Sequence, residues 1–243
     1  MTTIAIYSLK GGVGKTTMAV NLAWAAAALS SRRTLLWDLD PQAAATFLLG
    51  GEDSSRHEAQ AVFTRDVAPA KLARHTGFDR LDLIAADVSL RALDRIFHEL
   101  DKKKRLAKLI EELAASYDRV LLDCPPGLTE TSEQVMRAAN LIVVPVIPSP
   151  LAMRAFAEVE SHLARRGGKA PLMPVFSMAD RRRKLHADTL AARPDWPVIP
   201  MASIVEAMTE RRAPLGAFAS RHPSARAFAT LWQAIERRLA SAR

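Results

Sequence analysis

The sequence predicts an α/β fold, with a mostly parallel, twisted sheet flanked by helices on both faces. Short apolar runs alternate with longer helical stretches along the chain, which is the pattern of βαβ units. Only 6% of the residues are aromatic, which argues against a β-sandwich. The 243 residues are enough for a full α/β core, and we expect one domain over residues 1–243.

Seven apolar runs are expected to be strands, and eight stretches are expected to be helices. The strands are expected at residues 4–8, 34–39, 81–85, 119–122, 141–147, 173–177 and 198–200. The helices are expected at residues 16–29, 90–98, 102–116, 131–138, 152–165, 184–192, 204–211 and 225–240. The glycine-rich and polar stretch 50–57 is expected to be a surface loop within the domain.

The composition indicates a basic protein of a reducing compartment. The net charge of +8 and the pI near 10 indicate an anionic partner, either nucleic acid or a lipid surface, unless they reflect a generally basic proteome. Cys124 is the only cysteine, so one chain has no disulfide framework and no thiolate cluster. We find no signal peptide and no apolar run long enough to span a bilayer, and therefore expect a cytoplasmic protein.

A glycine-rich turn near the N-terminus predicts a phosphate-binding loop. It consists of Lys10, Gly11, Gly12, Val13, Gly14, Lys15, Thr16 and Thr17. An apolar, strand-like run precedes it and an alanine-rich helical run follows it. The backbone N–H groups of such a turn and the dipole of the following helix attract phosphate. Lys15 is expected to reach the β- and γ-phosphates, and the Thr16 hydroxyl is expected to bind Mg²⁺.

Two residues at the start of this turn depart from the usual phosphate-loop pattern. That pattern has a glycine where this chain has Leu9, and Lys10 adds a second lysine directly after it. The run K-G-G-x-G-K-[ST] resembles the deviant Walker A motif of the ParA/MinD family of P-loop ATPases. The resemblance implies a P-loop NTPase fold, ATP as the nucleotide, and a Lys10 side chain that reaches across a dimer interface to the partner's nucleotide.

A second motif places two carboxylates after an apolar run. Residues 35–37 lead into Asp38 and Asp40, and Pro41 and Gln42 follow. Side chains at alternate positions of a strand share a face, so both carboxylates are expected to face the phosphate loop; an ordinary strand-end turn is the alternative. The stretch is similar to the family's D-x-D-P-Q motif. That similarity implies that Asp38 lies near the water shell of Mg²⁺ and that Asp40 orients or activates the attacking water.

A third motif, in which the apolar residues Val120, Leu121 and Leu122 run into Asp123, predicts a buried strand that delivers one carboxylate to the site. This is the arrangement of a Walker B motif, whose aspartate holds Mg²⁺ directly or through a water. It is similar to the family's hhhhD-[CST]-P-P, and Cys124 is then expected to be a small packed residue rather than a redox centre. Residues 145–149 resemble the family's P-x-x-P-S, whose following helix contributes to the dimer face.

One cluster of cations is the best candidate for contacting DNA. It consists of Arg181, Arg182, Arg183 and Lys184. The cluster follows the predicted strand 173–177 and is expected to lie in a strand-to-helix loop at the nucleotide edge. Cations at a helix N-terminus oppose the helix dipole, which favours a functional role over an ordinary charged helix start. The stretch resembles the family's D-x-R-[TR] loop, which implies DNA contacts by these cations, Arg182 and Arg183 above all, and an adenine contact by Asp180.

One departure from the family concerns a second basic site. Many ParA proteins of the chromosomal branch have an arginine in N-V-R-x-S-E-A, where this chain has Ile204. Arg211 and Arg212 lie two helical turns farther on and are expected to substitute for it. The sequence has no groove-reading motif, so DNA is expected to be bound through its phosphates, without sequence preference and with a steep dependence on salt.

The resemblance is strongest over residues 1–46 and 117–151, and it implies a positioning ATPase of the ParA branch. ATP would join two subunits into a homodimer that binds double-stranded DNA, with Lys10, Lys15 and Asp40 in catalysis. A ParB-like protein or cargo adaptor would stimulate slow hydrolysis and so release the DNA. The cycle would partition or position a plasmid, a chromosome origin or a protein cluster, and the protein would associate with the nucleoid.

Two other classes of function remain open from the sequence. A MinD-type ATPase would insert a C-terminal amphipathic helix into lipid, and Phe228, Leu231, Trp232 and Ile235 have the spacing of such a stripe. No flexible linker separates this stretch from the rest, so packing onto the core is favoured over membrane binding. The third class is a metabolic or electron-transfer enzyme on the same scaffold, although a nitrogenase-iron-protein relative would need two cluster cysteines and this chain has one.

Overall fold

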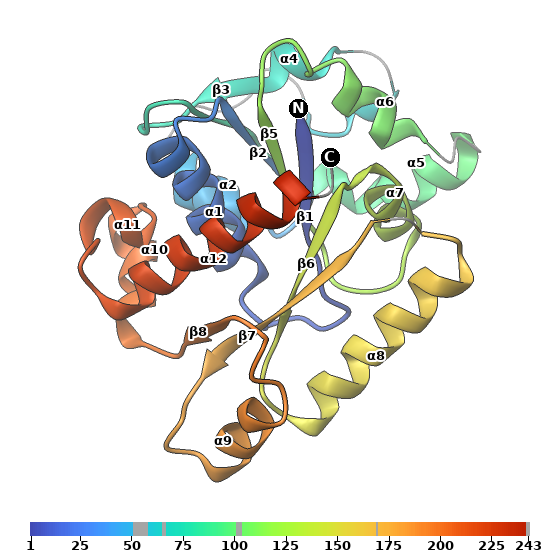
Figure 1. Ribbon diagram of the computed structural model, residues 1–243. Coiled ribbons are helices and arrows are strands. Elements are labelled where there is room, and N and C mark those ends of the chain that lie inside the picture. Colours follow the sequence, from blue (N-terminus) through green and yellow to red (C-terminus); the bar gives the residue numbers. More distant parts are fainter. Residues whose placement is uncertain (51–57, 65–66, 101–103, 169, 242–243) are drawn as a thin grey trace.

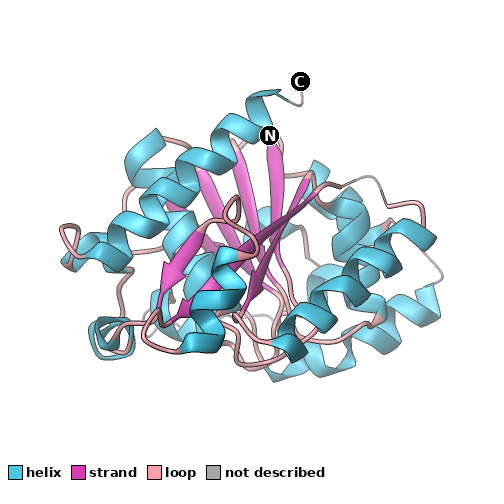
Figure 2. Ribbon diagram, turned by 60° about the horizontal axis from the view of Figure 1, so that its bottom comes forward, coloured by secondary structure: helices cyan, strands magenta, loops and turns pink. Residues whose placement is uncertain are grey.

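The computed structural model describes residues 1–50, 58–64, 67–100, 104–168 and 170–241, and an eight-stranded sheet forms its centre. The strand order is β3-β4-β2-β5-β1-β6-β7-β8, and helices cover both faces (Figures 1 and 2). All neighbouring strands are parallel except β3 and β4. The strands are β1 (Thr2–Ile6), β2 (Thr34–Asp38), β3 (Ala73–His75), β4 (Leu81–Ile84), β5 (Arg119–Asp123), β6 (Leu141–Val146), β7 (Leu172–Ala179) and β8 (Val198–Pro200).

The helices fall into two layers. Helices α1, α2 and α12 pack on one face of the sheet, and α5 to α8 pack on the other (Figure 1). The α-helices are α1 (Lys15–Ser30), α2 (Ala44–Leu49), α3 (Ala61–Thr64), α4 (Pro69–Leu72), α5 (Leu93–Leu100), α6 (Arg105–Glu111), α7 (Glu130–Ala138), α8 (Pro150–Arg165), α9 (Lys184–Ala191), α10 (Ala207–Arg211), α11 (Leu215–Phe218) and α12 (Pro223–Ser241). Two 3₁₀ turns, η1 (Val88–Ala92) and η2 (Ser203–Val205), complete the set.

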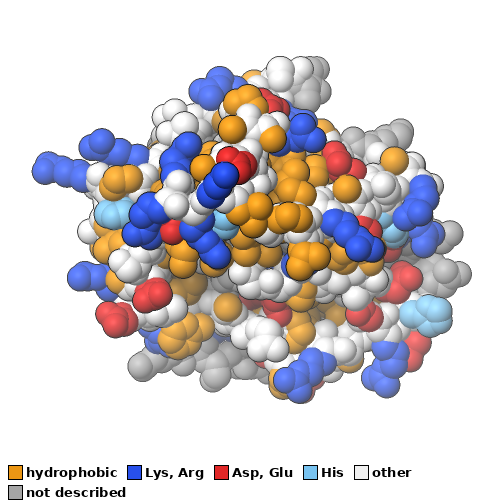
Figure 3. Space-filling model, turned by 90° about the horizontal axis from the view of Figure 1, so that it is seen from below, with side chains coloured by type: hydrophobic (Ala, Val, Ile, Leu, Met, Phe, Trp, Pro, Cys, Tyr) orange, Lys and Arg blue, Asp and Glu red, His pale blue; other side chains and the backbone are white. Residues whose placement is uncertain are grey.

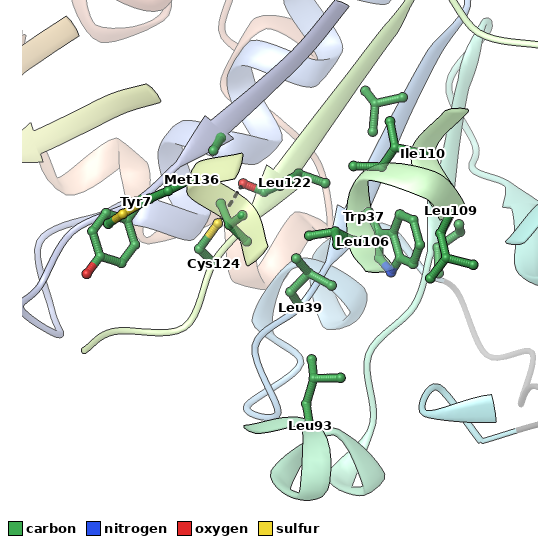
Figure 4. Packing of buried hydrophobic residues seen from close by; sticks show 14 of the residues in the cluster. Tyr7, Trp37, Leu39, Leu93, Leu106, Leu109, Ile110, Leu122, Cys124 and Met136 are labelled. Carbon is green, nitrogen blue, oxygen red and sulfur yellow. Dashed lines mark hydrogen bonds between the residues drawn. The ribbon is translucent and has the colours of Figure 1, made fainter. Parts of the chain in front are cut away.

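The apolar runs of the sequence are continuous because the central strands are buried on both faces. Ile4 and Ile6 of β1 belong to the core under α1 and α12, whereas Ala5 between them and Tyr7 after the strand belong to the core under α5 to α8. In the second core, Trp37 of β2 lies beside residues of α6 (Figure 4). The loops at the carboxyl ends of these strands are therefore held in place by a fully packed sheet.

The fold class predicted from the sequence is confirmed, and all seven predicted strands are present. The predicted helix 204–211 is wrong as a single helix, because η2 and α10 divide it. Five short elements were not predicted, namely β3, α2, α3, α4 and α11. Each has three to six residues, too few to show a periodicity. Residues 51–57 of the predicted surface loop and residues 102–103 of the predicted helix 102–116 lie outside the described residues.

The C-terminal helix α12 packs onto the body of the protein. Phe228, Leu231, Trp232 and Ile235 are buried in the core shared with α1. The indole Nε1 of Trp232 donates a hydrogen bond to Ser30 Oγ at 2.8 Å. The apolar stripe of α12 is therefore already covered by protein. This agrees with the expectation that the stretch packs onto the core. No helix in the part of the chain that the structure describes is long and apolar enough to cross a membrane.

Candidate nucleotide site

The glycine-rich turn between β1 and α1 has the backbone shape of a phosphate cradle. Gly12 and Gly14 have φ values of 71° and 85°, a left-handed conformation that glycine adopts without strain. No side chain caps the start of α1, which leaves the N–H groups of its first turn available to a ligand. A Cβ on Gly14 would lie 3.0 Å from Ser177 Oγ, so close packing against β7 also favours glycine there.

Lys15 is folded back over this turn. Its side chain is buried, although it carries a charge, and its Nζ donates a hydrogen bond to the carbonyl oxygen of Lys10 at 3.3 Å. Lys10 itself is half-buried, as are Thr16 and Thr17 in the first turn of α1. A buried ammonium group held by a single carbonyl is poorly satisfied. The arrangement leaves donors of Lys15 for an anion in the cradle.

Two buried carboxylates face each other across neighbouring strands. Asp38 and Asp123 are register partners at the carboxyl ends of β2 and β5, and neither is exposed. Both carboxylate oxygens of Asp123 are buried without a hydrogen-bond partner among the described residues. Burial raises the pKa of Asp123 well above its ordinary value, and the charge of Asp38 raises it further, while the nearby Thr16 hydroxyl and Lys15 ammonium oppose this rise.

Asp38 is satisfied where Asp123 is not. Its carboxylate accepts hydrogen bonds from the backbone N–H of Asp40 at 3.1 Å, from the N–H of Thr46 at 2.9 Å and from the hydroxyl of Thr46 at 2.8 Å. Burial nevertheless raises the pKa of Asp38 to about 6. The strand ends at Asp38, so Asp40 lies in the following turn and is half-buried. The alternation of side chains along a strand, which was expected to place both carboxylates on one face, therefore does not extend to Asp40.

These residues fit a magnesium ion. Buried, unpartnered carboxylate oxygens beside a threonine hydroxyl are the hard oxygen ligands that Mg²⁺ prefers. Among the described residues, no group of three or more histidine, cysteine, aspartate or glutamate side chains could hold a metal by itself. Mg²⁺ is commonly bound by one or two carboxylates together with phosphate oxygens and waters. Asp123 and Thr16 would therefore hold the ion with the nucleotide, and Asp38 would face its water shell.

The loop after β5 is tied to the phosphate loop by two hydrogen bonds. The Tyr7 hydroxyl donates to the carbonyl oxygen of Gly127 at 2.9 Å, and the N–H of Gly127 donates to the carbonyl oxygen of Leu9 at 3.2 Å. Cys124, just after Asp123, is completely buried in the core under α5 to α8. Burial raises the pKa of its thiol well above the ordinary value, so this cysteine has the properties of a packing residue.

A partly open pocket adjoins the phosphate loop on the side of β7 and β8. Gly14 and Thr17 line one wall. The other walls are mostly apolar and include Met178, Ile199, Met201, Val205 and Phe228. Sequence reasoning missed these residues, because they come from separate segments that carry no motif. The only local signal was that Met178 and Met201 directly follow predicted strands, where ligands of open α/β sheets bind.

The basic loop between β7 and α9 contains one cation that is already paired. Arg182 donates two hydrogen bonds to the carboxylate of Asp180, at 2.9 and 3.0 Å, and this contact lowers the pKa of Asp180 to about 2. Arg181, Arg183 and Lys184 are exposed and have no ion-pair partner among the described residues. The four side chains predicted to contact DNA therefore lie on the surface, but they differ in whether they already have a partner.

The second basic site lies on the segment around α10. Arg211 stacks on the ring of Phe218 at 5.1 Å, and Arg212 on that of Phe47 at 4.6 Å. Both arginines remain exposed. Ile204, which stands where the family's chromosomal branch has an arginine, packs against the core under α1 and α12. The structure thus explains the apolar residue at position 204 by packing.

Comparisons with known proteins identify the family of this chain. The family model described as "AAA domain" matches residues 1–165. Chromosome partitioning protein ParA of Caulobacter vibrioides is 34% identical over 191 residues, which are 75% of this chain and 71% of that protein. A virulence plasmid ParA family protein of Chlamydia psittaci is 29% identical over 193 residues, which are 77% of this chain and 73% of that protein.

Solved structures share the fold. The ATP complex of a variant of McdA from Cyanothece has a TM-score of 0.83 at 21% identity, covering 97% of this chain and 96% of that one. Cobyrinic acid a,c-diamide synthase from Mycobacterium smegmatis, solved with ADP and magnesium, has a TM-score of 0.81 at 26% identity, covering 100% and 97%. The phosphate loop, the two aspartate strands and the ParA relatives lead to one assignment. This chain belongs to the ParA/MinD family of P-loop ATPases, in its ParA branch.

Proposed function

We propose that this protein is an ATPase that dimerises with ATP, binds DNA without sequence preference, and partitions or positions a cargo. The observation that carries the proposal is the concentration of functional features at one edge of the sheet. The phosphate loop, the two buried carboxylates, the pocket beside Gly14 and the basic loop all follow the carboxyl ends of strands. Binding of nucleotide at this edge can therefore alter the surface that meets a partner.

The chemistry at this edge is phosphoryl transfer to water. Backbone N–H groups at Gly11, Gly12, Gly14 and Thr16 would bind the phosphates, with the Lys15 ammonium on the β- and γ-phosphates. Mg²⁺ supplies charge neutralisation to the phosphates when bound. Asp40, half-buried at the opening of the site, would orient the attacking water.

The pocket between the ends of β7 and β8 suits the planar base of ATP, because its walls are mostly apolar and it adjoins Thr17. Asp180, at the end of β7, would contribute to binding of the adenine. Its carboxylate is bound to Arg182, so a side-chain contact with the base requires exchange of that ion pair. A contact through the backbone of this loop requires no such exchange.

Exposed apolar side chains support a dimer across this edge. Among the described residues, seven of the nine large exposed hydrophobic side chains follow or end strands at the carboxyl edge. They are Phe47, Val88, Leu128, Leu151, Met178, Leu185 and Met201. Seen from this edge, apolar side chains gather in the middle with cations around them (Figure 3). We infer that a second copy covers the apolar part, and that Lys10 then reaches the partner's nucleotide.

The cations around this apolar area would bind DNA phosphates. Arg181, Arg183 and Lys184 are free for this role, and Arg182 joins them if it leaves Asp180. Arg211 and Arg212 present a second pair. A ParB-like protein or cargo adaptor would stimulate slow hydrolysis and end DNA binding, so that the protein acts on the nucleoid within the cytoplasm. The buried stripe of α12 disfavours the MinD-type alternative of lipid insertion through that helix.

The test is retention on non-specific double-stranded DNA with ATP, with ADP and without nucleotide, across a salt series. We expect retention with ATP only, with an affinity that falls steeply as salt rises. The variant Asp40→Ala, which should bind ATP but hydrolyse it slowly, is expected to stay on DNA longer than the natural protein. Retention that is equal in all three nucleotide states would contradict the proposal, and ATP-dependent binding to anionic vesicles alone would favour the membrane alternative.

A further inference from the structure

Helix α2 connects the predicted magnesium site to a predicted DNA contact. The N–H and the hydroxyl of Thr46 both donate to Oδ2 of Asp38, at 2.9 and 2.8 Å. The same hydroxyl oxygen accepts a hydrogen bond from the N–H of Ala86 at 2.8 Å. The threonine hydroxyl is thus used both as donor and as acceptor, which fixes its direction.

Among the residues that the structure describes, no other side chain donates to Asp38. It is completely buried, and its remaining contact is the backbone N–H of Asp40 on Oδ1 at 3.1 Å. Helix α2, in turn, lacks a capping side chain of its own, because Ala43 occupies its N-cap position with φ 54°. The Asp38 carboxylate and the start of α2 therefore depend on each other for hydrogen bonds.

The next residue of α2, Phe47, lies at the surface and contacts Arg212. The ring of Phe47 is 51% exposed, and the guanidinium of Arg212 lies 4.6 Å from its centre. The segment that holds Arg212 is also attached to α1, since Asn21 Oδ1 accepts a hydrogen bond from the N–H of Leu215 at 2.9 Å. The position of Arg212 is therefore set by two helices that both begin at the nucleotide site.

We propose that Thr46 is a positioning residue that aims the Asp38 carboxylate at the Mg²⁺ shell, and that α2 couples this contact to the placement of Arg212. The first half concerns the magnesium site alone. The second half rests on the proposed function, because it gives Arg212 a role in DNA binding. The expected consequence is that loading the site with Mg²⁺ and ATP changes how firmly Arg212 is presented to DNA.

The first half is tested by the Mg²⁺ requirement for binding a fluorescent ATP analogue. Thr46→Val keeps the shape and the backbone N–H but removes the hydroxyl, and it should raise the half-saturating Mg²⁺ concentration about tenfold, the loss of one hydrogen bond to a charged group. Thr46→Ser keeps the hydroxyl and should stay within about twofold of the natural protein. A purely structural role would lower the folded fraction without moving the half-saturating concentration. An unchanged Mg²⁺ requirement in Thr46→Val overturns this half, and Thr46→Ala replaces that variant if it does not fold.

The second half is tested by a double-mutant cycle on DNA retention at saturating Mg²⁺ and ATP. The single variants are Thr46→Val and Arg212→Ala, and the double variant combines them. Coupled residues give losses that are not additive, so the double variant should lose at least threefold less affinity than the product of the two single losses. Additive losses overturn the coupling.

A matched pair of ring substitutions separates the two arginines. Phe47→Leu removes the ring under Arg212, and Phe218→Leu removes the ring under Arg211. Phe47 also belongs to the apolar area proposed to meet a second copy, so ATP-dependent dimerisation of both variants is measured alongside. Between variants that dimerise equally, only Phe47→Leu should reproduce the loss of DNA retention expected for Thr46→Val. If the natural protein binds no DNA with ATP, the proposed function fails, whereas the Mg²⁺ titration still decides the role of Thr46.

Discussion

The carboxyl ends of β2 and β5 lie side by side and yet have opposite character. Asp38, at the end of β2, accepts three hydrogen bonds from the turn and helix that follow it. Asp123, its register partner at the end of β5, accepts none in the described part of the chain, although it is equally buried. One carboxylate is thus integrated into the fold, and the other is left for a ligand.

This difference shows how a fold can tolerate a destabilising group at a functional site. A buried ionised group without a partner is destabilising, and Asp123 is tolerated because β1, β2 and the two helical layers make its surroundings rigid. Asp38 contributes to that rigidity by capping α2. The following predictions test the contrast between groups that have partners and groups kept free, from the largest expected effect to the smallest.

The largest effect is expected from Lys15, the buried ammonium group nearest to the free carboxylate. Lys15→Ala should weaken ATP binding about 100-fold or more, because it removes charge-assisted hydrogen bonds to the phosphates. Isothermal titration with Mg²⁺ and ATP measures this loss. Lys10→Ala is the control, since it should preserve ATP binding by a single subunit and affect only the steps that need the dimer. Undiminished affinity in Lys15→Ala would remove the phosphate-loop assignment.

The two aspartates should respond in opposite directions when each is changed to asparagine in the absence of nucleotide. Asp123→Asn removes an unsatisfied charge and should raise the free energy of unfolding by about 1 kcal/mol. Asp38→Asn exchanges an acceptor for a donor facing Thr46 and should lower it by about 1–3 kcal/mol. Urea unfolding at pH 8 without Mg²⁺ measures both. If both variants changed the free energy of unfolding in the same direction, the carboxylate of Asp123 would not be destabilising in the nucleotide-free protein. With Mg²⁺ and ATP added, the natural protein should gain stability while Asp123→Asn should not.

The contribution of Asp38 to the stability of the nucleotide-free protein should fall as the pH rises from about 4 to about 6. Burial raises the pKa of Asp38 to about 6, so the folded state holds a proton that the unfolded chain has already lost. The stabilisation from this group is therefore complete below its unfolded pKa and is lost as the pH passes its folded pKa. Unfolding curves of the natural protein and of Asp38→Asn are compared at each pH. Their difference separates the contribution of Asp38 from that of the histidines, which both proteins share. A difference that stays constant over this range contradicts the prediction.

The smallest effect is expected at the basic loop, where the same contrast recurs. Arg183 has no ion-pair partner among the described residues, whereas Arg182 is bound to Asp180. Arg183→Ala should reduce the slope of log affinity for DNA against log salt by about one, as expected for one lost phosphate contact. Arg182→Ala should reduce it less. Equal reductions would mean that Arg182 leaves Asp180 when DNA binds.

The sequence predicts the strands and the phosphate loop because their signals are local. Glycines before an alanine-rich helix and apolar runs into Asp38 and Asp123 each need only a few consecutive residues. The contacts of Thr46 with Asp38 and Ala86 join three separate segments, and a six-residue helix such as α2 is too short for its periodicity to be seen.

The pocket between β7 and β8 could not be predicted for a similar reason. Met178 adopts φ 54° at an irregular point of β7, and no residue pattern in the sequence predicts this backbone conformation. The packing of half-buried Ile204 against the core under α1 and α12 likewise depends on contacts between segments far apart in the sequence. The DNA contacts remain predictions, because they concern a partner that one folded chain does not include, and the single-domain organisation remains a prediction as well.

The two outermost strands of the sheet, β3 and β8, have only three residues each. A long, uncovered edge strand is a template on which another chain can add a strand, and this is a common start of aggregation. Short edges offer few free backbone groups, and β3 also carries Arg74 and His75. Copies of this protein at high local concentration therefore run little risk of joining irreversibly through the backbones of these two strands.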